Sequence, residues 1–99
     1  ILNKEIIAIN QDALGKAATR VINEKDYQVF VRPLSGNRHA LAIMNTADKA
    51  QKLSVIFKKL GLDGKYKMRD VWQHKDVAKN ANKWSGNVNA HETKVWVLE

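Results

Sequence analysis

Three tryptophans and three histidines are the side chains of this sequence best suited to bind a ligand or to transfer a proton. Trp72 is expected at the end of a strand and Trp84 after a loop, where an exposed indole could stack on a sugar face or on a nucleobase. Packing within the protein is the first interpretation of every ring, above all of Trp96, which stands between two valines. Trp72 and Trp84, together with His74, are therefore the candidate contacts for a carbohydrate.

The histidines fit neither a metal site nor a catalytic triad. His39, His74 and His91 are far apart, and none has another histidine or a cysteine at ligand spacing. His74 has polar neighbours after an expected strand, but no serine or cysteine stands in a nucleophile motif. We therefore predict no metal ion and no cofactor, and we interpret the histidines as surface or hydrogen-bonded residues.

Glycoside hydrolysis requires two carboxyl groups that face one bond. Asp70 and Asp76 are two carboxylates and could in principle form such a pair. Each stands beside a basic residue, however, so we expect them to form surface ion pairs or to stabilise turns instead. Gly61 and Gly64 are too few to form a phosphate-binding loop, and no helix is expected after them. We therefore name no catalytic residue in this chain.

The composition, 44% hydrophobic and 27% charged over 99 residues, describes one globular domain. A net charge of +7 can indicate contact with nucleic acid or membrane, but the thirteen lysines are spread along the whole chain. No apolar run approaches the roughly 20 residues of a membrane helix, and no signal peptide is visible. We therefore predict neither nucleic acid nor membrane as a partner. The absence of cysteine leaves the redox compartment open.

The spacing of apolar residues changes from a helical to a strand period near position 18. A helix is expected within 1–11, because Asn3 can cap it and Leu2, Ile6 and Ile9 form an apolar stripe. After this point apolar and polar residues alternate, and turn signals recur about every 8–12 positions. This pattern is typical of an antiparallel β-sandwich. About eight strands are expected, at 19–24, 27–33, 38–45, 52–57, 66–71, 76–77, 86–90 and 93–98.

The strands at 27–33 and 38–45 are expected to form a hairpin in the middle of a sheet. Val29, Val31, Leu41 and Ile43 should face the core, and the opposite faces are also mostly apolar, which predicts cover on both sides. The segment 79–83, by contrast, shows no periodicity, so we expect a mobile loop there.

Motifs along nearly the whole chain resemble one family. The run NKEIIAINQDALG at 3–15 resembles the segment that closes the catalytic barrel of family 27 glycoside hydrolases, the α-galactosidase or melibiase family. Further motifs resemble successive parts of that family's C-terminal domain, at 31–36, 40–45, 69–76 and 91–98. Ala13 departs from the pattern, which usually has proline there, and this loosens the connection between helix and strand.

The resemblance implies a longer enzyme, in which a (β/α)8 barrel precedes an antiparallel, Greek-key-like β-sandwich. Residues 1–15 would be the remnant of the last barrel helix and its linker, and 16–99 would be the sandwich. Ile6, Ile7 and Ile9 would then face the barrel. In that family two aspartates of the barrel carry out retaining hydrolysis, and no residue here matches their motifs. A sequence that begins at Ile1 rather than with methionine is also expected to be a piece of a longer protein.

The resemblance therefore implies a non-catalytic accessory domain that packs against and stabilises the barrel of a secreted or periplasmic α-galactosidase. Two alternatives stay open: a carbohydrate-binding module that uses Trp72, His74 and Trp84, and a nucleic-acid binder suggested by net charge alone. The substrate is also open, because α-N-acetylgalactosaminidases share the same sandwich.

Overall fold

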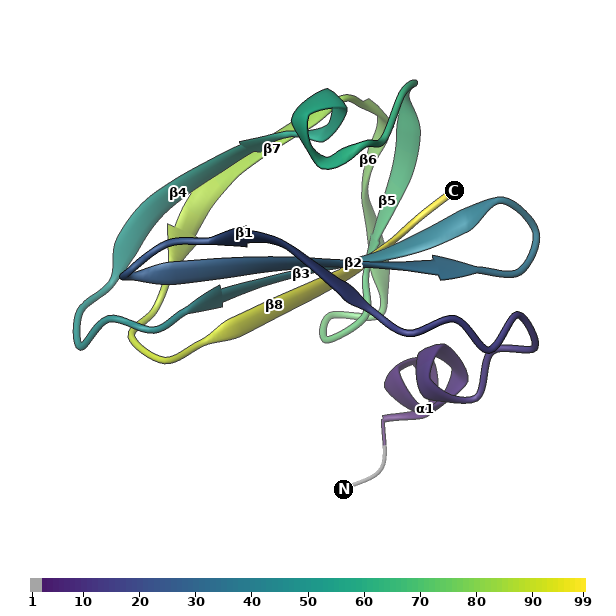
Figure 1. Ribbon diagram of the computed structural model, residues 1–99, viewed down its shortest axis with the longest axis horizontal. Coiled ribbons are helices and arrows are strands. Elements are labelled where there is room, and N and C mark those ends of the chain that lie inside the picture. The colour runs from purple at the N-terminus through teal and green to yellow at the C-terminus, as the bar shows by residue number, and fades with distance from the viewer. Residues whose placement is uncertain (1–2) are drawn as a thin grey trace.

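The computed structural model describes residues 3–99, in which it places one α-helix, one 3-10 helix and eight strands (Figure 1). The helices are α1 (Lys4–Asn10) and η1 (Phe57–Leu60). The strands are β1 (Thr19–Asn23), β2 (Tyr27–Leu34), β3 (Arg38–Asn45), β4 (Gln51–Ile56), β5 (Tyr66–Asp70), β6 (Lys75–Ala81), β7 (Lys83–Val88) and β8 (Thr93–Leu98). Because all strand pairs are antiparallel, the predicted all-β sandwich with a short N-terminal helix is confirmed.

The strands form two sheets that enclose one core. The large sheet has the order β1-β2-β3-β8-β5-β6, and β4 and β7 form a separate two-stranded ribbon. Figure 1 shows this ribbon on one side of the large sheet and α1 on the other. We call the side that faces the β4–β7 ribbon the inner face and the side that carries α1 the outer face.

The predicted central hairpin is confirmed. β2 and β3 pair from Tyr27 with Asn45 to Leu34 with Arg38, and they lie in the interior of the large sheet. Because side chains alternate along a strand, one set of apolar residues from this hairpin reaches the core and the other lies on the outer face.

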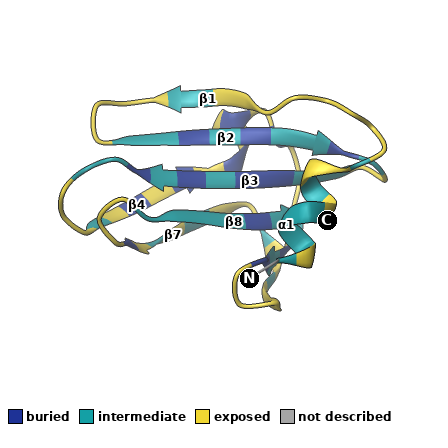
Figure 2. Cartoon of the chain, turned by 90° about the horizontal axis from the view of Figure 1, so that it is seen from below, coloured by how far each residue is buried: buried dark blue, intermediate teal, exposed yellow. Residues whose placement is uncertain are grey.

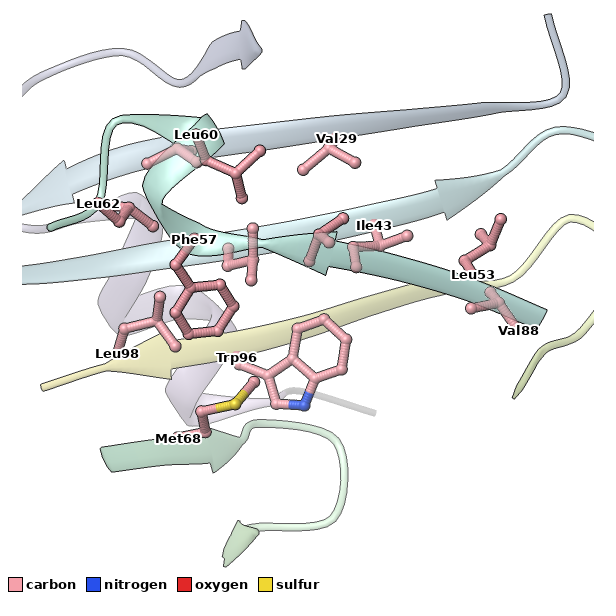
Figure 3. Packing of buried hydrophobic residues seen from close by; sticks show 13 residues of the cluster. Val29, Ile43, Leu53, Phe57, Leu60, Leu62, Met68, Val88, Trp96 and Leu98 are labelled. Carbon is pink, nitrogen blue, oxygen red and sulfur yellow. The ribbon is translucent and has the colours of Figure 1, made fainter. Parts of the chain in front are cut away.

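The core lies between the inner face and the ribbon. Figure 3 shows Phe57, Met68 and Leu98 gathered around Trp96, whose predicted core position is confirmed. The cluster of buried apolar residues consists of Val29, Val31, Leu41, Ile43, Leu53, Val55, Phe57, Leu60, Leu62, Met68, Val88, Trp96 and Leu98. Burial of this apolar area is the main source of stability for such a fold.

The predicted mobile loop at 79–83 is wrong. Its first three residues continue β6 and its last residue begins β7, on either side of a turn at Asn82. The pairing of β6 with β5 shifts register on both sides of Met68, which breaks the alternation expected of a strand. Ala78 and Ala81 pack against the core but give little apolar signal. β6 is therefore longer than expected, and β7 starts and ends earlier than expected. The other strands lie within one residue of their predicted bounds.

The predicted helix near the N-terminus is confirmed as α1. The Oδ1 atom of Asn3 accepts hydrogen bonds from the backbone N–H groups of Glu5 and Ile6, as expected of an N-cap. Positions 1 and 2, including Leu2 of the predicted stripe, lie outside the described residues. A helix of seven residues is too short to persist alone in water, so contacts with the sheet must hold it in place.

Candidate functional site

The turn between β5 and β6 carries two of the three candidate sugar contacts. The carboxylate of Asp70 accepts hydrogen bonds from the backbone N–H groups of Trp72 and Gln73, each at 2.9 Å, and so fixes the turn. The indole N–H of Trp72 donates to the carbonyl oxygen of Thr93 at 3.2 Å, while 53% of the residue remains exposed. Trp72 therefore lies at the end of a strand, as predicted, and presents a fixed aromatic surface to solvent.

His74 belongs to the same turn but contacts the N-terminal helix. Its Nδ1 atom bonds to the carboxylate of Glu5, which also accepts a hydrogen bond from Nε of Arg69 at 2.6 Å. Arg69 in turn donates to the carbonyl oxygen of His74 at 3.0 Å and pairs with Asp76 at 3.4 Å. We call the four residues Glu5, Arg69, His74 and Asp76 the Glu5 clasp.

The clasp holds α1 to the β5–β6 turn. Hydrogen bonds from Arg69, and then from His74, lower the pKa of Glu5 below its ordinary value. Close by, the side-chain amide of Asn3 donates to the carbonyl oxygen of Val71 at 3.0 Å. Polar contacts with the large sheet therefore fix the first turn of α1.

The Glu5 clasp predicts a pH-dependent contribution to stability. Because the folded-state pKa of Glu5 is lowered, its stabilising effect is complete above the unfolded-state pKa and disappears as the pH falls through the lowered value. We expect Glu5→Gln to lower the free energy of unfolding by about 0.5–1 kcal/mol near neutral pH, because the ion pairs are partly exposed. The difference from wild type should shrink and then disappear as the pH falls through the lowered pKa of Glu5, as measured by urea unfolding at several pH values.

Glu24→Gln is the matched control, because Glu24 is exposed and forms no ion pair within residues 3–99. It should leave the stability almost unchanged at every pH. An effect of Glu5→Gln that persists at the acidic end would contradict the clasp, since by then the wild-type carboxyl is protonated too.

The linker after α1 is fixed by a second polar contact. The carboxylate of Asp12 accepts hydrogen bonds from the N–H and the hydroxyl group of Ser35, at 2.7 and 2.8 Å, and from the N–H of Leu14 at 3.0 Å. Arg38 approaches the same carboxylate at 3.3 Å. Burial raises the pKa of Asp12, but the hydrogen bonds from Ser35 and Leu14 outweigh this effect and leave it below its ordinary value. Helix and linker are thus both tied to the sandwich.

Trp84 does not join Trp72 and His74. It lies in β7, where its ring packs against Trp96 with the ring centroids 4.7 Å apart. Part of its aromatic surface is therefore used in packing between the sheets, and a role of Trp84 in sugar contact stays a prediction. The structure thus unites two of the three candidates in one turn and separates the third.

The remaining histidines have structural surroundings. His39 packs edge-on against the ring of Tyr66, and burial lowers its pKa. His91 is exposed and bonds to Asp48 at 2.9 Å. Within residues 3–99 no three histidine, cysteine or acidic side chains are grouped as a metal ion would require. No helix in the same range is both long and apolar enough to cross a membrane.

An apolar hollow lies between α1 and the outer face of the large sheet, with a volume of about 220 Å³. Its lining residues come from the helix, the linker and three strands: Ile6, Ile9, Asn10, Ala18, Phe30, Arg32, Ala40, Ala42 and Val95. Figure 2 shows α1 over one part of this face, while the strands beyond the helix are only partly buried. Ile6 and Ile9 thus border their own sheet, and the prediction that the helix faces a barrel stays a prediction.

Together, these features define a β-sandwich domain that carries a short helix tied to its outer face and whose cluster of buried side chains is almost entirely apolar. Residues 24–98 match the family described as the α-galactosidase C-terminal β-sandwich domain. The chain belongs to this family, as its motifs indicated.

The chain is similar to one part of longer plant enzymes. It is 37% identical over 102 residues to α-galactosidase 3 of Arabidopsis thaliana, across 97% of this chain and 23% of that protein. It is 34% identical over 98 residues to the α-galactosidase of Coffea arabica, across 97% of this chain and 26% of that protein. The chain thus spans about a quarter of the length of these relatives.

Solved structures contain the same fold. The α-galactosidase I of Mortierella vinacea matches 97% of this chain with a TM-score of 0.88 and 27% identity, over 26% of its own length. A β-L-arabinopyranosidase of Geobacillus stearothermophilus matches 98% of this chain with a TM-score of 0.88 and 25% identity, over 22% of its length. Enzymes named for different sugars therefore share this domain, and its fold does not identify a substrate.

Proposed function

We propose that the chain is the non-catalytic C-terminal domain of a retaining α-galactosidase, and that it packs against and stabilises the catalytic barrel of that enzyme. The observation that carries this proposal is the match of the chain to a C-terminal family and to about a quarter of each α-galactosidase relative. The catalytic aspartates of such an enzyme belong to the barrel, according to the family resemblance. A secreted or periplasmic location is part of the same proposal and rests on the resemblance alone.

The outer face supports a role in packing. Its strands carry apolar side chains that are only half buried, including Phe30, Met44 and Val95. The polar contacts of α1 and of the linker hold both segments on this same side of the large sheet. A domain with this arrangement has one face already filled by the β4–β7 ribbon and a second that can be covered by a neighbour.

The placement of the chemistry is tested by an assay of the isolated chain on a chromogenic α-galactoside. We expect no turnover above the rate without protein, because the chain brings no catalytic pair. The full-length enzyme that contains this sequence is the positive control and should release the chromophore. Turnover by the isolated chain at a comparable rate would overturn the assignment of this domain as non-catalytic.

A second candidate function is sugar binding at the β5–β6 turn. It is favoured by the exposed ring of Trp72, whose N–H is already bonded to Thr93, so that the aromatic face is held in one orientation. His74 contributes less to such a site, because its Nδ1 atom is bonded to Glu5.

Titration of the chain with galacto-oligosaccharides, followed by tryptophan fluorescence, tests this candidate. If sugar stacks on Trp72, a change in emission at millimolar sugar should disappear in Trp72→Ala and persist in Trp84→Phe, which alters a packed ring. An unchanged spectrum at millimolar sugar would count against sugar binding, and packing would remain as the only proposed role. The predictions that nucleic acid and membranes are not partners stay predictions.

A further inference from the structure

The hollow on the outer face is concave because its floor consists of small side chains. Ala40 and Ala42 of β3 lie between Phe30 of β2 and Val95 of β8, which are larger and stand on the neighbouring strands. Ile6 of α1 forms part of the opposite wall. A volume of about 220 Å³ lined in this way can receive an apolar side chain from another surface.

A positive charge borders the hollow. The guanidinium group of Arg32 donates one hydrogen bond, from Nη2 to the carbonyl oxygen of Asn10 at 3.4 Å, and its Nε atom is enclosed without a partner in the described chain. No carboxylate within residues 3–99 forms an ion pair with Arg32. Burial of a charge against apolar surface costs free energy unless an opposite charge pairs with it. The hollow is therefore best matched by an apolar group with a carboxylate beside it.

The relatives indicate which surface could occupy this site. Each relative is about four times as long as this chain, and the matched family is a C-terminal one, so most of each relative precedes the segment equivalent to this domain. In this structure the first element of the domain, α1, forms one wall of the hollow. A polypeptide that arrives through α1 thus reaches the domain at the outer face.

We propose that the hollow receives an apolar side chain of the preceding catalytic domain, and that Arg32 pairs with a carboxylate of that domain. This inference rests on the proposed function, and it adds the site and the chemistry of the contact. The contact couples the two domains, because a side chain seated between α1 and β3 joins the catalytic part to the helix and the sheet at once.

The experiment uses the full-length enzyme that contains this sequence and compares two substitutions. Ala42→Phe fills the hollow from its floor, without changing the inner face of the sheet. Ser54→Phe is the matched control, since it adds the same ring at an exposed position of β4. We expect one unfolding transition by calorimetry for the wild type and for the control, and two separate transitions for Ala42→Phe.

A charge reversal provides a second variant that leaves the volume of the hollow open. Arg32→Glu should also separate the transitions, because it would place two carboxylates opposite each other, whereas Lys52→Glu on exposed β4 should not. The same four variants of the isolated chain should keep the circular dichroism spectrum of the wild type. That result would exclude loss of folding as the cause.

The outcomes separate this inference from the proposed function. Two independent transitions in the wild-type enzyme would overturn both, since the domains would then not stabilise each other. A single transition in Ala42→Phe and in Arg32→Glu would overturn the docking site alone. Sedimentation of the isolated wild-type chain as a dimer that Ala42→Phe converts to a monomer would assign the hollow to a second copy, and so would overturn the inferred occupant.

Discussion

Replacement of Asn45 by leucine is expected to lower the free energy of unfolding by about 3–5 kcal/mol, because the side chain is fully buried and joins three segments. Its amide nitrogen donates to the carbonyl oxygens of Lys49 and Val88, each at 2.9 Å, and of Asn89 at 3.1 Å. Its oxygen accepts from the N–H of Ala47 at 2.9 Å and from the amide of Gln51 at 2.6 Å. Leucine would remove all of these hydrogen bonds, including the fully buried one to Val88.

Asn45→Asp gives the same prediction a pH signature. The new carboxylate would face the carbonyl oxygens that now accept from the amide, so burial and repulsion should raise its folded-state pKa. Stability should therefore fall as the pH rises above the unfolded-state pKa of aspartate, near 3.9, and the variant should be least unstable in acid. Urea unfolding of Asn45→Asp and of the exposed control Asn87→Asp measures both effects. Equal stabilities of the two variants at neutral pH would contradict the role of Asn45.

Substitution of Gly86 by alanine is expected to destabilise the domain by about 1–3 kcal/mol. A Cβ atom at this position would lie 2.8 Å from Cζ2 of Trp84, closer than side chains tolerate. The ring cannot move away freely, because it packs on the buried ring of Trp96. Without that contact, alanine should stabilise a strand by about 0.4–1 kcal/mol relative to glycine.

A double-mutant cycle isolates this contact. In a Trp84→Leu background the crowding ring is absent, so Gly86→Ala should become neutral or stabilising, which corresponds to a coupling of at least about 1 kcal/mol. Thermal unfolding of the four proteins gives the coupling. Ser85→Ala, at the exposed neighbouring position, should show no such dependence on Trp84. A loss of stability from Gly86→Ala that is the same in both backgrounds would place its cause elsewhere.

The large sheet could be predicted where each strand alternates cleanly. Val29 and Ile43 belong to strands with regular register, and both are buried in the core as expected. β6 was missed over most of its length, because its irregular pairing and its inward alanines give no periodic signal. Local patterns thus predict strands that pair regularly and fail where a bulge or a small side chain interrupts the alternation.

The candidate site was less predictable, because its contacts join distant positions. Arg69 and Glu5 are 64 positions apart, and nothing near either residue indicates that they form an ion pair. The ion pair of Arg69 with Asp76 agrees better with the sequence, which predicts a surface ion pair for Asp76, because both residues lie in one hairpin. The contact of Trp84 with Trp96 could not be predicted either, since it depends on how the two sheets stack. Residue types could suggest candidates, but only the fold could decide which of them meet.

The position of β8 determines when the large sheet can be completed. β8 is the last strand in the sequence, yet it lies between β3 and β5. Until it inserts, the β1-β2-β3 meander and the β5–β6 hairpin are separate pieces, each with an open edge that could pair with another chain. During synthesis such a protein depends on its final strand to join the halves, so assembly is expected to be slow and concerted rather than stepwise from the N-terminus.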